Sequence, residues 1–449
     1  MPQSKELEDL LHAEIVQLRE EGCNTAELQA EMERARKSLA QQAVALYETL
    51  YAQASELSPE PGFGYQEPSD LEGLRAARPD GPRRLGSPPG DAELGDRILG
   101  AWLGRCAGCM LGKPVEGKHK SEIDRVLEAA GEPELTDYFP PLAQVPEGMH
   151  YPGPESNLLR GNITHGVRDD DTDYTVIGLH CLEENGPGFT SLDVASQWQQ
   201  HLPYHCVYTA ERVAYKNLVD GLLPPESATF RNPFREWIGA QIRCDAFGYA
   251  APGWPEKAAE FAFRDAAVSH VKNGIYGEMF FAALIAASLV LDDLDQAIDT
   301  ALAEIPARSR LAEAVQQTRA FCAGEADWRN AWERINGAYG HYHGVHTINN
   351  AALVLMGLLY GAREKDPAAF YERAICLAVW GGWDTDCNGA TAGSVAGALL
   401  GASKLPGKWT SVLNDRLESI VVGLTDNRIS DLAGRTVKVA KEGRGGSAG

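Results

Sequence analysis

The chain has 449 residues, of which 44% are hydrophobic, 23% charged and 8% aromatic. This is enough apolar material for a large buried core, and it excludes a wholly disordered protein. Lys and Arg total 41 against 63 Asp and Glu, a formal charge of −22 at pH 7, and such a charge repels polyanions. We therefore expect neither a nucleic acid polymer nor a membrane as a partner.

Residues 1–57 carry apolar side chains at helical spacing, first at Leu7, Leu11, Ile15 and Leu18, and then at Leu28, Met32, Leu39, Leu46 and Leu50. Gly22 can end the first helix, and Asn24 can cap the second. We predict an N-terminal helical hairpin here. The pattern is compatible with packing on the main domain, with binding a partner and with oligomerisation through the hairpin, and the sequence does not choose among them.

The remaining chain divides by composition. Residues 58–94 are rich in Pro and Gly and predict a linker, and residues 441–449 predict a disordered tail. Between them, residues 95–440 show successive helical patterns without alternating strands, which predicts an all-α domain. The N-terminus lacks a basic stretch followed by an apolar one, and the apolar run 279–291 is too short to cross a bilayer. We expect a cytoplasmic protein whose nine cysteines are reduced.

Two predicted helices carry glycine at every fourth position, which places the glycines of each helix on one face. The first set is Gly100, Gly104, Gly108 and Gly112, and the second is Gly389, Gly393, Gly397 and Gly401. Such faces favour close helix packing in a soluble core. If the two helices cross antiparallel, the end of the first, near Glu116, lies close to the start of the second, near Asp384.

Two acid-rich segments each precede an apolar helical stretch. The first, RDDDTDYT, contains Asp169, Asp170, Asp171 and Asp173, and the second, GGWDTDC, contains Asp384 and Asp386. Clustered carboxylates repel one another unless something neutralises them. One interpretation is a pair of solvated helix N-termini. The other is a shared site for Mg²⁺ or Mn²⁺, which prefer such hard oxygen ligands and can activate a bound water.

Three further patterns allow other interpretations. The positions of Asp169, Asp170 and Asp173 match the Asp-Asp-x-x-Asp motif of Mg²⁺-dependent isoprenoid-type enzymes. The histidines of HYHGVHTINN, which are His341, His343 and His346, fit a zinc site, a polar loop facing the substrate or structural hydrogen bonding. Cys387 follows Asp386 directly, and the neighbouring carboxylates disfavour a nucleophilic thiolate, so we interpret it as a residue that lines the site.

Taken together, three segments resemble the ADP-ribosylglycohydrolases, which include the dinitrogenase reductase-activating glycohydrolases. They are GAWLGRCAGCMLGKPVEG from Gly100, RDDDTDYT from Arg168 and GGWDTDCNGATAGSVAGALLGA from Gly381. The resemblance covers about residues 95–440 and does not reach the predicted hairpin or linker. It implies an orthogonal helical bundle with two Mg²⁺ or Mn²⁺ ions, and hydrolysis of a ribosyl glycosidic bond. The implied substrate is an ADP-ribosylated protein or a small molecule that contains ADP-ribose.

The resemblance also implies roles for single residues. Glu116 and Asp171 are expected to carry catalysis, and the implied metal ligands are Asp169, Asp170, Asp171, Asp384, Asp386 and Cys387. His270 follows Ser269 as in the family's Ser/Thr-His pair near the substrate. His346 and Asn349 are further candidates for substrate binding. Gly248 and Gly253, in IRCDAFGYAAPG, could bring backbone N–H groups close to an anion.

The chain departs from the family pattern at two positions. Asp169 stands where the family generally has Thr or Ser, and Cys387 stands where it often has Thr. These departures leave the number of ions and the metal preference open, with Mg²⁺ or Mn²⁺ still favoured. A third interpretation, beside hydrolase and isoprenoid-type enzyme, is a non-catalytic binding protein of this fold, like the related jellyfish lens crystallins. The retained Asp clusters argue against it, because a purely structural protein has no need for so much repelling charge.

Overall fold

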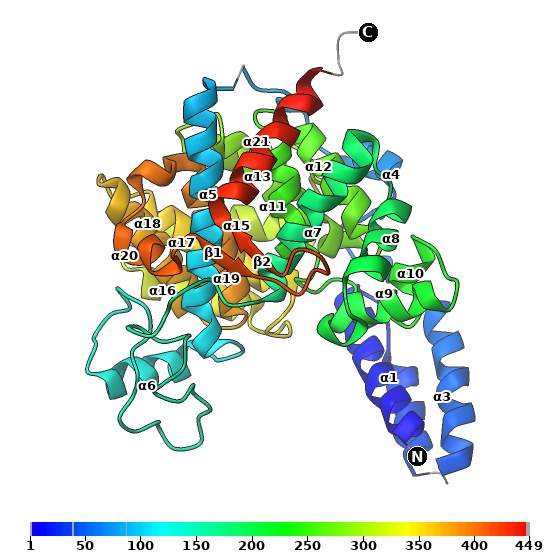
Figure 1. The fold of residues 1–449 in the computed structure, drawn as a ribbon. Helices are drawn as coiled ribbons and strands as arrows, with labels where there is room; N and C mark the ends of the chain where they lie inside the picture. The colour runs from blue at the N-terminus through cyan, green and yellow to red at the C-terminus, as the bar shows by residue number, and fades with distance from the viewer. Residues whose placement is uncertain (1, 38–39, 87, 446–449) are drawn as a thin grey trace.

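The computed structural model describes residues 2–37, 40–86 and 88–445 (Figure 1). These residues form 21 α-helices and one two-stranded antiparallel sheet, which confirms the predicted all-α class. The bounds of the elements follow in chain order.

The first half contains α1 (Pro2–Glu20), α2 (Ala26–Ala35), α3 (Ala40–Ser55), α4 (Leu71–Ala77), α5 (Asp91–Gly112), α6 (Lys120–Ala130), α7 (Asp170–Asn185), α8 (Ser191–His201), α9 (Thr209–Val219), α10 (Glu226–Thr229) and α11 (Cys244–Ala250). The second half contains α12 (Pro255–Ala266), α13 (Lys272–Ser288), α14 (Leu294–Leu302), α15 (Arg310–Gly324), α16 (Trp328–Tyr339), α17 (Thr347–Gly361), α18 (Pro367–Trp380), α19 (Thr385–Leu400), α20 (Gly407–Thr410), β1 (Arg416–Glu418), β2 (Asp426–Arg428) and α21 (Ile429–Gly445).

The glycine-spaced helices α5 and α19 lie antiparallel and in backbone contact. A Cβ added at Gly104 would lie 2.1 Å from the carbonyl oxygen of Gly393, and one at Gly108 would lie 1.9 Å from that of Gly389. Because no side chain fits between them, the two helices approach as closely as their backbones allow. The antiparallel crossing expected from the glycine spacing is confirmed.

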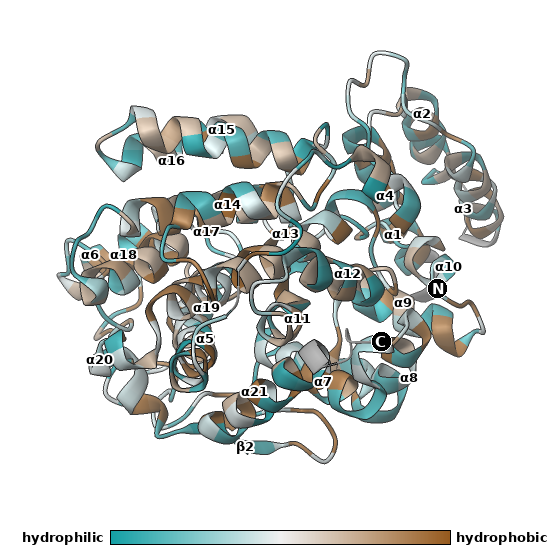
Figure 2. Ribbon diagram, turned by 90° about the horizontal axis from the view of Figure 1, so that it is seen from above, coloured by the Kyte–Doolittle hydropathy of each residue, from teal (hydrophilic) through white to brown (hydrophobic). Residues whose placement is uncertain are grey.

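The core surrounds this pair. Every residue of α13 from Asn273 to Ser288 is buried, and α17 and α19 are buried along nearly their whole length. A helix that is hydrophobic all round belongs inside a large domain. Viewed from above, α14 and α15 lie outside α13 and α17 as an outer layer (Figure 2). No helix among the described residues is long and apolar enough to cross a membrane, and all nine cysteines are free.

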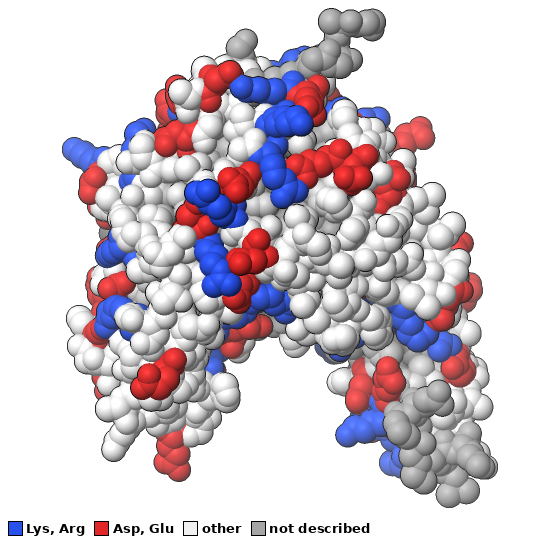
Figure 3. Space-filling view, in the orientation of Figure 1, with Lys and Arg blue, Asp and Glu red and all other residues white. Residues whose placement is uncertain are grey.

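The N-terminal segment contains three described helices. The predicted second helix is divided into α2 and α3, and residues 38 and 39 lie outside the described residues. These helices share a hydrophobic core of their own, formed by Leu11, Ile15, Leu28, Met32 and Leu50 among others. These helices and the region of α6 both extend downward from the main body in Figure 1, at its opposite ends. The surface is deeply hollowed between these two extensions (Figure 3).

The segment expected to be a linker is built into the main domain. It contains α4, and its Glu67 accepts a hydrogen bond of 2.7 Å from Arg310, a largely buried residue at the start of α15. At the other end of the chain, α21 runs to Gly445, past the predicted boundary at residue 440, and residues 446–449 lie outside the described part.

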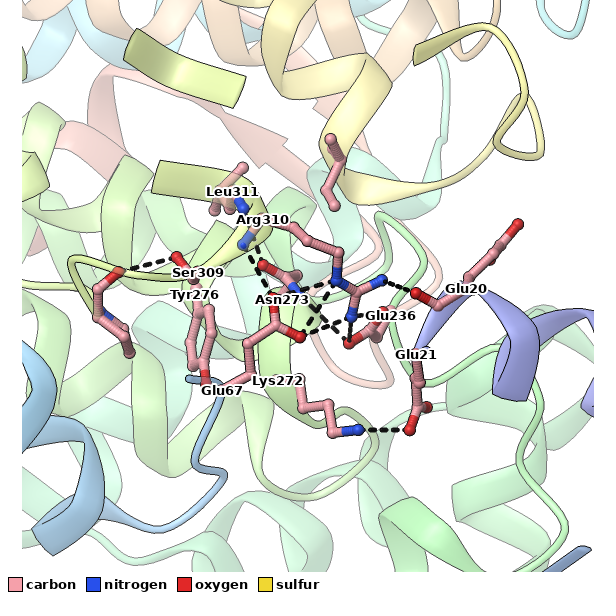
Figure 4. A network of polar contacts seen from close by, with 12 residues as sticks. Glu20, Glu21, Glu67, Glu236, Lys272, Asn273, Tyr276, Ser309, Arg310 and Leu311 are labelled. Atoms are coloured by element: carbon pink, nitrogen blue, oxygen red, sulfur yellow. Dashed lines mark hydrogen bonds and ion pairs between the residues drawn. The ribbon is translucent and has the colours of Figure 1, made fainter. Parts of the chain in front are cut away.

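A buried polar network joins α1 to the main domain (Figure 4). The Arg310 guanidinium donates hydrogen bonds to Glu67, to Glu236 at 2.7 Å and to the backbone carbonyl of Glu20 at 2.9 Å. Lys272 forms an ion pair with Glu21. Of the three options that the sequence left open for the N-terminal helices, the structure shows packing on the main domain. Binding of a partner and oligomerisation stay predictions.

Replacing Arg235 with Met tests this docking. Arg235 pairs with both Glu14 and Glu21 at 2.8 Å, and its side chain is 9% exposed. Removing the cation leaves two largely buried carboxylates without this partner, so the free energy of unfolding should fall by about 3 kcal/mol or more. Urea denaturation of the full chain measures the loss. Arg34→Met is the matched control, because Arg34 is 71% exposed and its pair with Glu31 should contribute less than about 1 kcal/mol. Equal losses in the two variants would contradict the expectation.

Candidate functional site

The candidate site forms where α5 ends and α19 begins. The N–H of Gly117 donates to the carbonyl of Trp383 at 2.9 Å, and the N–H of Trp383 donates to the carbonyl of Lys118 at 2.8 Å. Thr385 adds a hydrogen bond from its hydroxyl to the carbonyl of Gly112 at 2.8 Å. These contacts place Glu116 beside the first turn of α19, as expected from the antiparallel crossing.

Carboxylates from both acid-rich segments meet at this junction. The described residues contain two groups of three donor side chains whose ligand atoms all lie within 4.8 Å of one another. One group is Glu116, Asp384 and Asp386, and the other is Asp171, Asp386 and Cys387. Asp386 belongs to both groups, and Glu116 is the exposed member among buried ones. Segments far apart in the sequence therefore build one cluster.

Asp169 is engaged by other protein groups. It caps α7 by accepting a hydrogen bond of 3.0 Å from the N–H of Asp171, and it forms an ion pair with Lys113 at the end of α5. Burial on its own would raise the pKa of Asp169, but the Lys113 ammonium outweighs burial and holds this pKa below its usual range. Asp169 belongs to neither donor group, and neither does Asp170, which is partly buried on the first turn of α7.

Asp171 is held by a fully buried arginine. The guanidinium of Arg105 donates to one carboxylate oxygen of Asp171 at 3.2 Å and to the backbone carbonyl of Asp171 at 2.6 Å. The other carboxylate oxygen accepts a hydrogen bond of 3.1 Å from the thiol of Cys387. Asp173 is turned elsewhere: it pairs with Arg168 at 2.7 Å and accepts the N–H of Ile420 at 2.8 Å. It anchors the acidic segment to the loop after β1.

Arg105 and Lys113 balance only part of the charge of the cluster, and Asp384 and Asp386 form no ion pair among the described residues. Burial raises the pKa of Asp386 well above its ordinary value, and repulsion from Glu116 and Asp169 raises it further. The pKa of Asp384 is raised in the same way by burial and by Asp386. Asp386 is only 3% exposed, so water does not cover its oxygens, and its Oδ1 atom has no hydrogen-bond partner among the described residues. An orphaned buried oxygen among repelling carboxylates fits a divalent cation.

The HYHGVHTINN segment, whose last residues form the start of α17, contacts the site through hydrogen bonds. Asn350 accepts hydrogen bonds from the N–H of Asp384 at 3.2 Å and from the side chain of Asn388 at 2.9 Å. His346 caps α17 by accepting the N–H of Ile348 at 3.2 Å, and Asn349 donates to the carbonyl of His343 at 3.0 Å. In the described chain, His341, His343 and His346 do not form a group of three converging metal donors. The structural interpretation therefore fits this loop better than zinc.

Three residues expected near the substrate are committed to internal contacts. His270 is fully buried, and its ring is 2.8 Å from the hydroxyl of Ser269. Gly248 lies in α11, where a Cβ would meet Ile285 at 2.8 Å. The N–H of Gly253 donates to the carbonyl of Ala286 at 2.8 Å. In this conformation Gly253 offers no free N–H to an anion, and the roles expected for these three residues stay predictions.

Arg105, Lys113 and Asn350 were not among the residues expected at the site. The signal for the first two was present, because Arg105 and Lys113 interrupt an otherwise apolar, glycine-spaced helix. A charged residue inside such a helix needs a buried partner. Here Arg105 pairs with Asp245 and Asp171, and Lys113 pairs with Asp169. Asn350 gave no comparable signal, since Asn is common at the start of helices for capping reasons alone.

Comparison with known proteins identifies the family of the chain. The family model described as ADP-ribosylglycohydrolase matches residues 90–444. No curated protein sequence matches the chain. Among solved structures, an ADP-ribosylglycohydrolase-related protein complex has 21% sequence identity to this chain, with a TM-score of 0.50. The similarity covers 78% of this chain and 99% of the other, and it shows a shared fold. The chain therefore belongs to the ADP-ribosylglycohydrolase family, a family of glycosidase-type hydrolases.

Proposed function

We propose that the protein hydrolyses a ribosyl glycosidic bond in a metal-dependent reaction and releases ADP-ribose from a modified protein side chain or a small molecule. The observation that carries the proposal is the pair of donor groups that share Asp386 and its unpartnered Oδ1. The ligands would come from Glu116, Asp171, Asp384 and Asp386. A divalent ion bound there would fix the ribose hydroxyls and lower the pKa of a water molecule.

The protein's own groups divide the remaining work. Breaking the bond builds positive charge at the anomeric carbon, and buried carboxylates stabilise such charge. Glu116 is the exposed carboxylate of its group, so one of its Oε atoms could bind the ion while the other takes a proton from the attacking water. Arg105 holds one oxygen of Asp171 and leaves the other facing the cluster, which keeps this carboxylate in a fixed orientation.

The geometry gives the isoprenoid-type alternative less support. That interpretation needs Asp173 to act together with Asp169 and Asp170. In the structure, Asp173 pairs with Arg168 and accepts the N–H of Ile420, while Asp169 is bound by Lys113. These three carboxylates therefore do not present a common set of free oxygens to a diphosphate-bound ion.

The test is an assay of the purified chain on arginine-linked and serine-linked ADP-ribosyl peptides and on O-acetyl-ADP-ribose. We expect free ADP-ribose from at least one substrate with Mg²⁺ or Mn²⁺, and none in excess chelator, because the carboxylates alone cannot replace the ion. Release that is unaffected by chelator would contradict the metal requirement. Metal binding without release from any of the three substrates would favour the non-catalytic alternative.

A further inference from the structure

The two donor groups of the site differ in chemistry. Glu116, Asp384 and Asp386 offer oxygen atoms alone, whereas Asp171, Asp386 and Cys387 offer two oxygens and a sulfur. Oxygen donors select hard cations such as Mg²⁺ and Mn²⁺, and thiolate sulfur selects softer ones. This difference is a property of the chain's own residues at the site.

Cys387 faces the carboxylates. It lies in the first turn of α19, is 6% exposed and donates its thiol hydrogen to Asp171 at 3.1 Å. Arg105 holds the opposite oxygen of that carboxylate, so the sulfur and the Asp171 oxygen stay side by side. Asp386 completes the group, and its Oδ1 is buried without a hydrogen-bond partner in the described part of the chain. A buried oxygen without a hydrogen-bond partner is a ligand atom that a cation would satisfy.

An additional hard ligand from Asp169 is not free at this position. One of its oxygens faces the Lys113 ammonium and the other accepts the N–H of Asp171. Releasing Asp169 would break an ion pair and remove the cap of α7. The group that contains Cys387 therefore cannot draw on this oxygen at low cost, and sulfur is its third donor.

We propose that Asp171, Asp386 and Cys387 form a mixed sulfur and oxygen site for a borderline divalent cation such as Zn²⁺, Co²⁺ or Fe²⁺, next to an all-oxygen site for Mg²⁺ or Mn²⁺ at Glu116, Asp384 and Asp386. On binding, the S–H bond of Cys387 breaks, its electron pair forms the sulfur–metal bond, and the proton passes to solvent. No oxidation or reduction takes place. The proposal rests on the same carboxylate cluster as the proposed function.

The experiment is a titration of the metal-free, full-length protein with Co²⁺, followed by ultraviolet absorption. Bound sulfur gives a thiolate-to-Co²⁺ charge-transfer band, which should saturate at one equivalent and persist in excess Mg²⁺. Cys387→Ser should abolish the band and weaken Co²⁺ binding by about tenfold or more. Cys322→Ser is the matched control, because Cys322 is buried on α15 and belongs to neither donor group. It should keep the band.

The outcomes separate this inference from the proposed function. If Co²⁺ binds without a charge-transfer band, and with equal affinity in Cys387→Ser, the sulfur site is wrong while the metal-dependent hydrolase stands. If the band is present and Cys387→Ser removes it, the inference holds whatever substrate is later found. If none of Co²⁺, Mn²⁺ and Mg²⁺ binds, the sulfur site and the metal requirement of the proposed function are both wrong.

Discussion

Replacing Asp386 with Asn is expected to lower the rate of metal-dependent ADP-ribose release by about 10³-fold, because this side chain supplies an oxygen to both donor groups. A bound metal ion contributes several kcal/mol to a transition state, and about 1.4 kcal/mol corresponds to a tenfold change in rate. Turnover under saturating substrate measures the fall in rate. The variant should also bind less metal, and the metal content after dialysis measures this loss.

The fold should survive this change. Asn has nearly the volume of Asp, and in the metal-free protein the Asp386 carboxylate is buried and repelled by Glu116 and Asp169. The midpoint of thermal unfolding of the metal-free variant should therefore be equal to or above that of the metal-free parent. Asp173→Asn is the matched control from the same set of acids, since Asp173 contacts Arg168 and Ile420, and it should keep its metal. Full turnover together with full metal content in Asp386→Asn would show that Asp386 is not a metal ligand.

Replacing Gly108 with Ala is the second large effect that we expect. The added methyl group would lie 1.9 Å from the carbonyl oxygen and 2.4 Å from the carbonyl carbon of Gly389. Both atoms belong to a helix backbone, so α5 and α19 must move apart. We expect the free energy of unfolding to fall by about 3 kcal/mol or more. Metal affinity should fall too. Glu116 lies just after α5 and Asp384 just before α19, so moving the two helices apart also separates these two carboxylates. Urea denaturation and a Mn²⁺ titration measure the two effects.

The control for this substitution lies on the same helix. A Cβ at Gly95 would have no described atom within 4 Å, so Gly95→Ala should leave stability unchanged or raise it by up to about 1 kcal/mol through helix propensity. If Gly108→Ala were as stable as Gly95→Ala, the close crossing of α5 and α19 would be wrong.

Some parts of the site could be predicted from sequence, because the glycine spacing and the acid-rich helix starts are local patterns that follow directly from the contacts they make. Glycine at every fourth position marks a helix face that another backbone touches, and acids beside Thr mark a helix start. The structure places Asp169 at the N-cap of α7 and Asp384 at the N-cap of α19. The glycine spacing and the predicted helix starts together suffice to place Glu116 near Asp384 from sequence alone.

Other parts depend on partners that no local pattern reveals. Glu67 lies in a segment with the composition of a linker, yet it is buried because Arg310 needs a second carboxylate beside Glu236. His270 sits in a Ser-His pair that resembles the family's substrate residues, yet it is enclosed by the core. Similarly, the Asp169 carboxylate could be a metal ligand by its chemistry, but it forms an ion pair with Lys113, which comes from a distant part of the sequence.

The side-chain-free crossing of α5 and α19 would tie the proposed ion binding to global folding. Each donor group draws residues from segments far apart in the sequence, so neither group exists in the unfolded chain. An ion that binds the native state alone stabilises it by mass action, by about 2.7 kcal/mol at a free concentration of one hundred times Kd. The unfolding midpoint should therefore rise with the logarithm of free metal concentration, and metal scarcity in the cell would lower the protein's abundance as well as its activity.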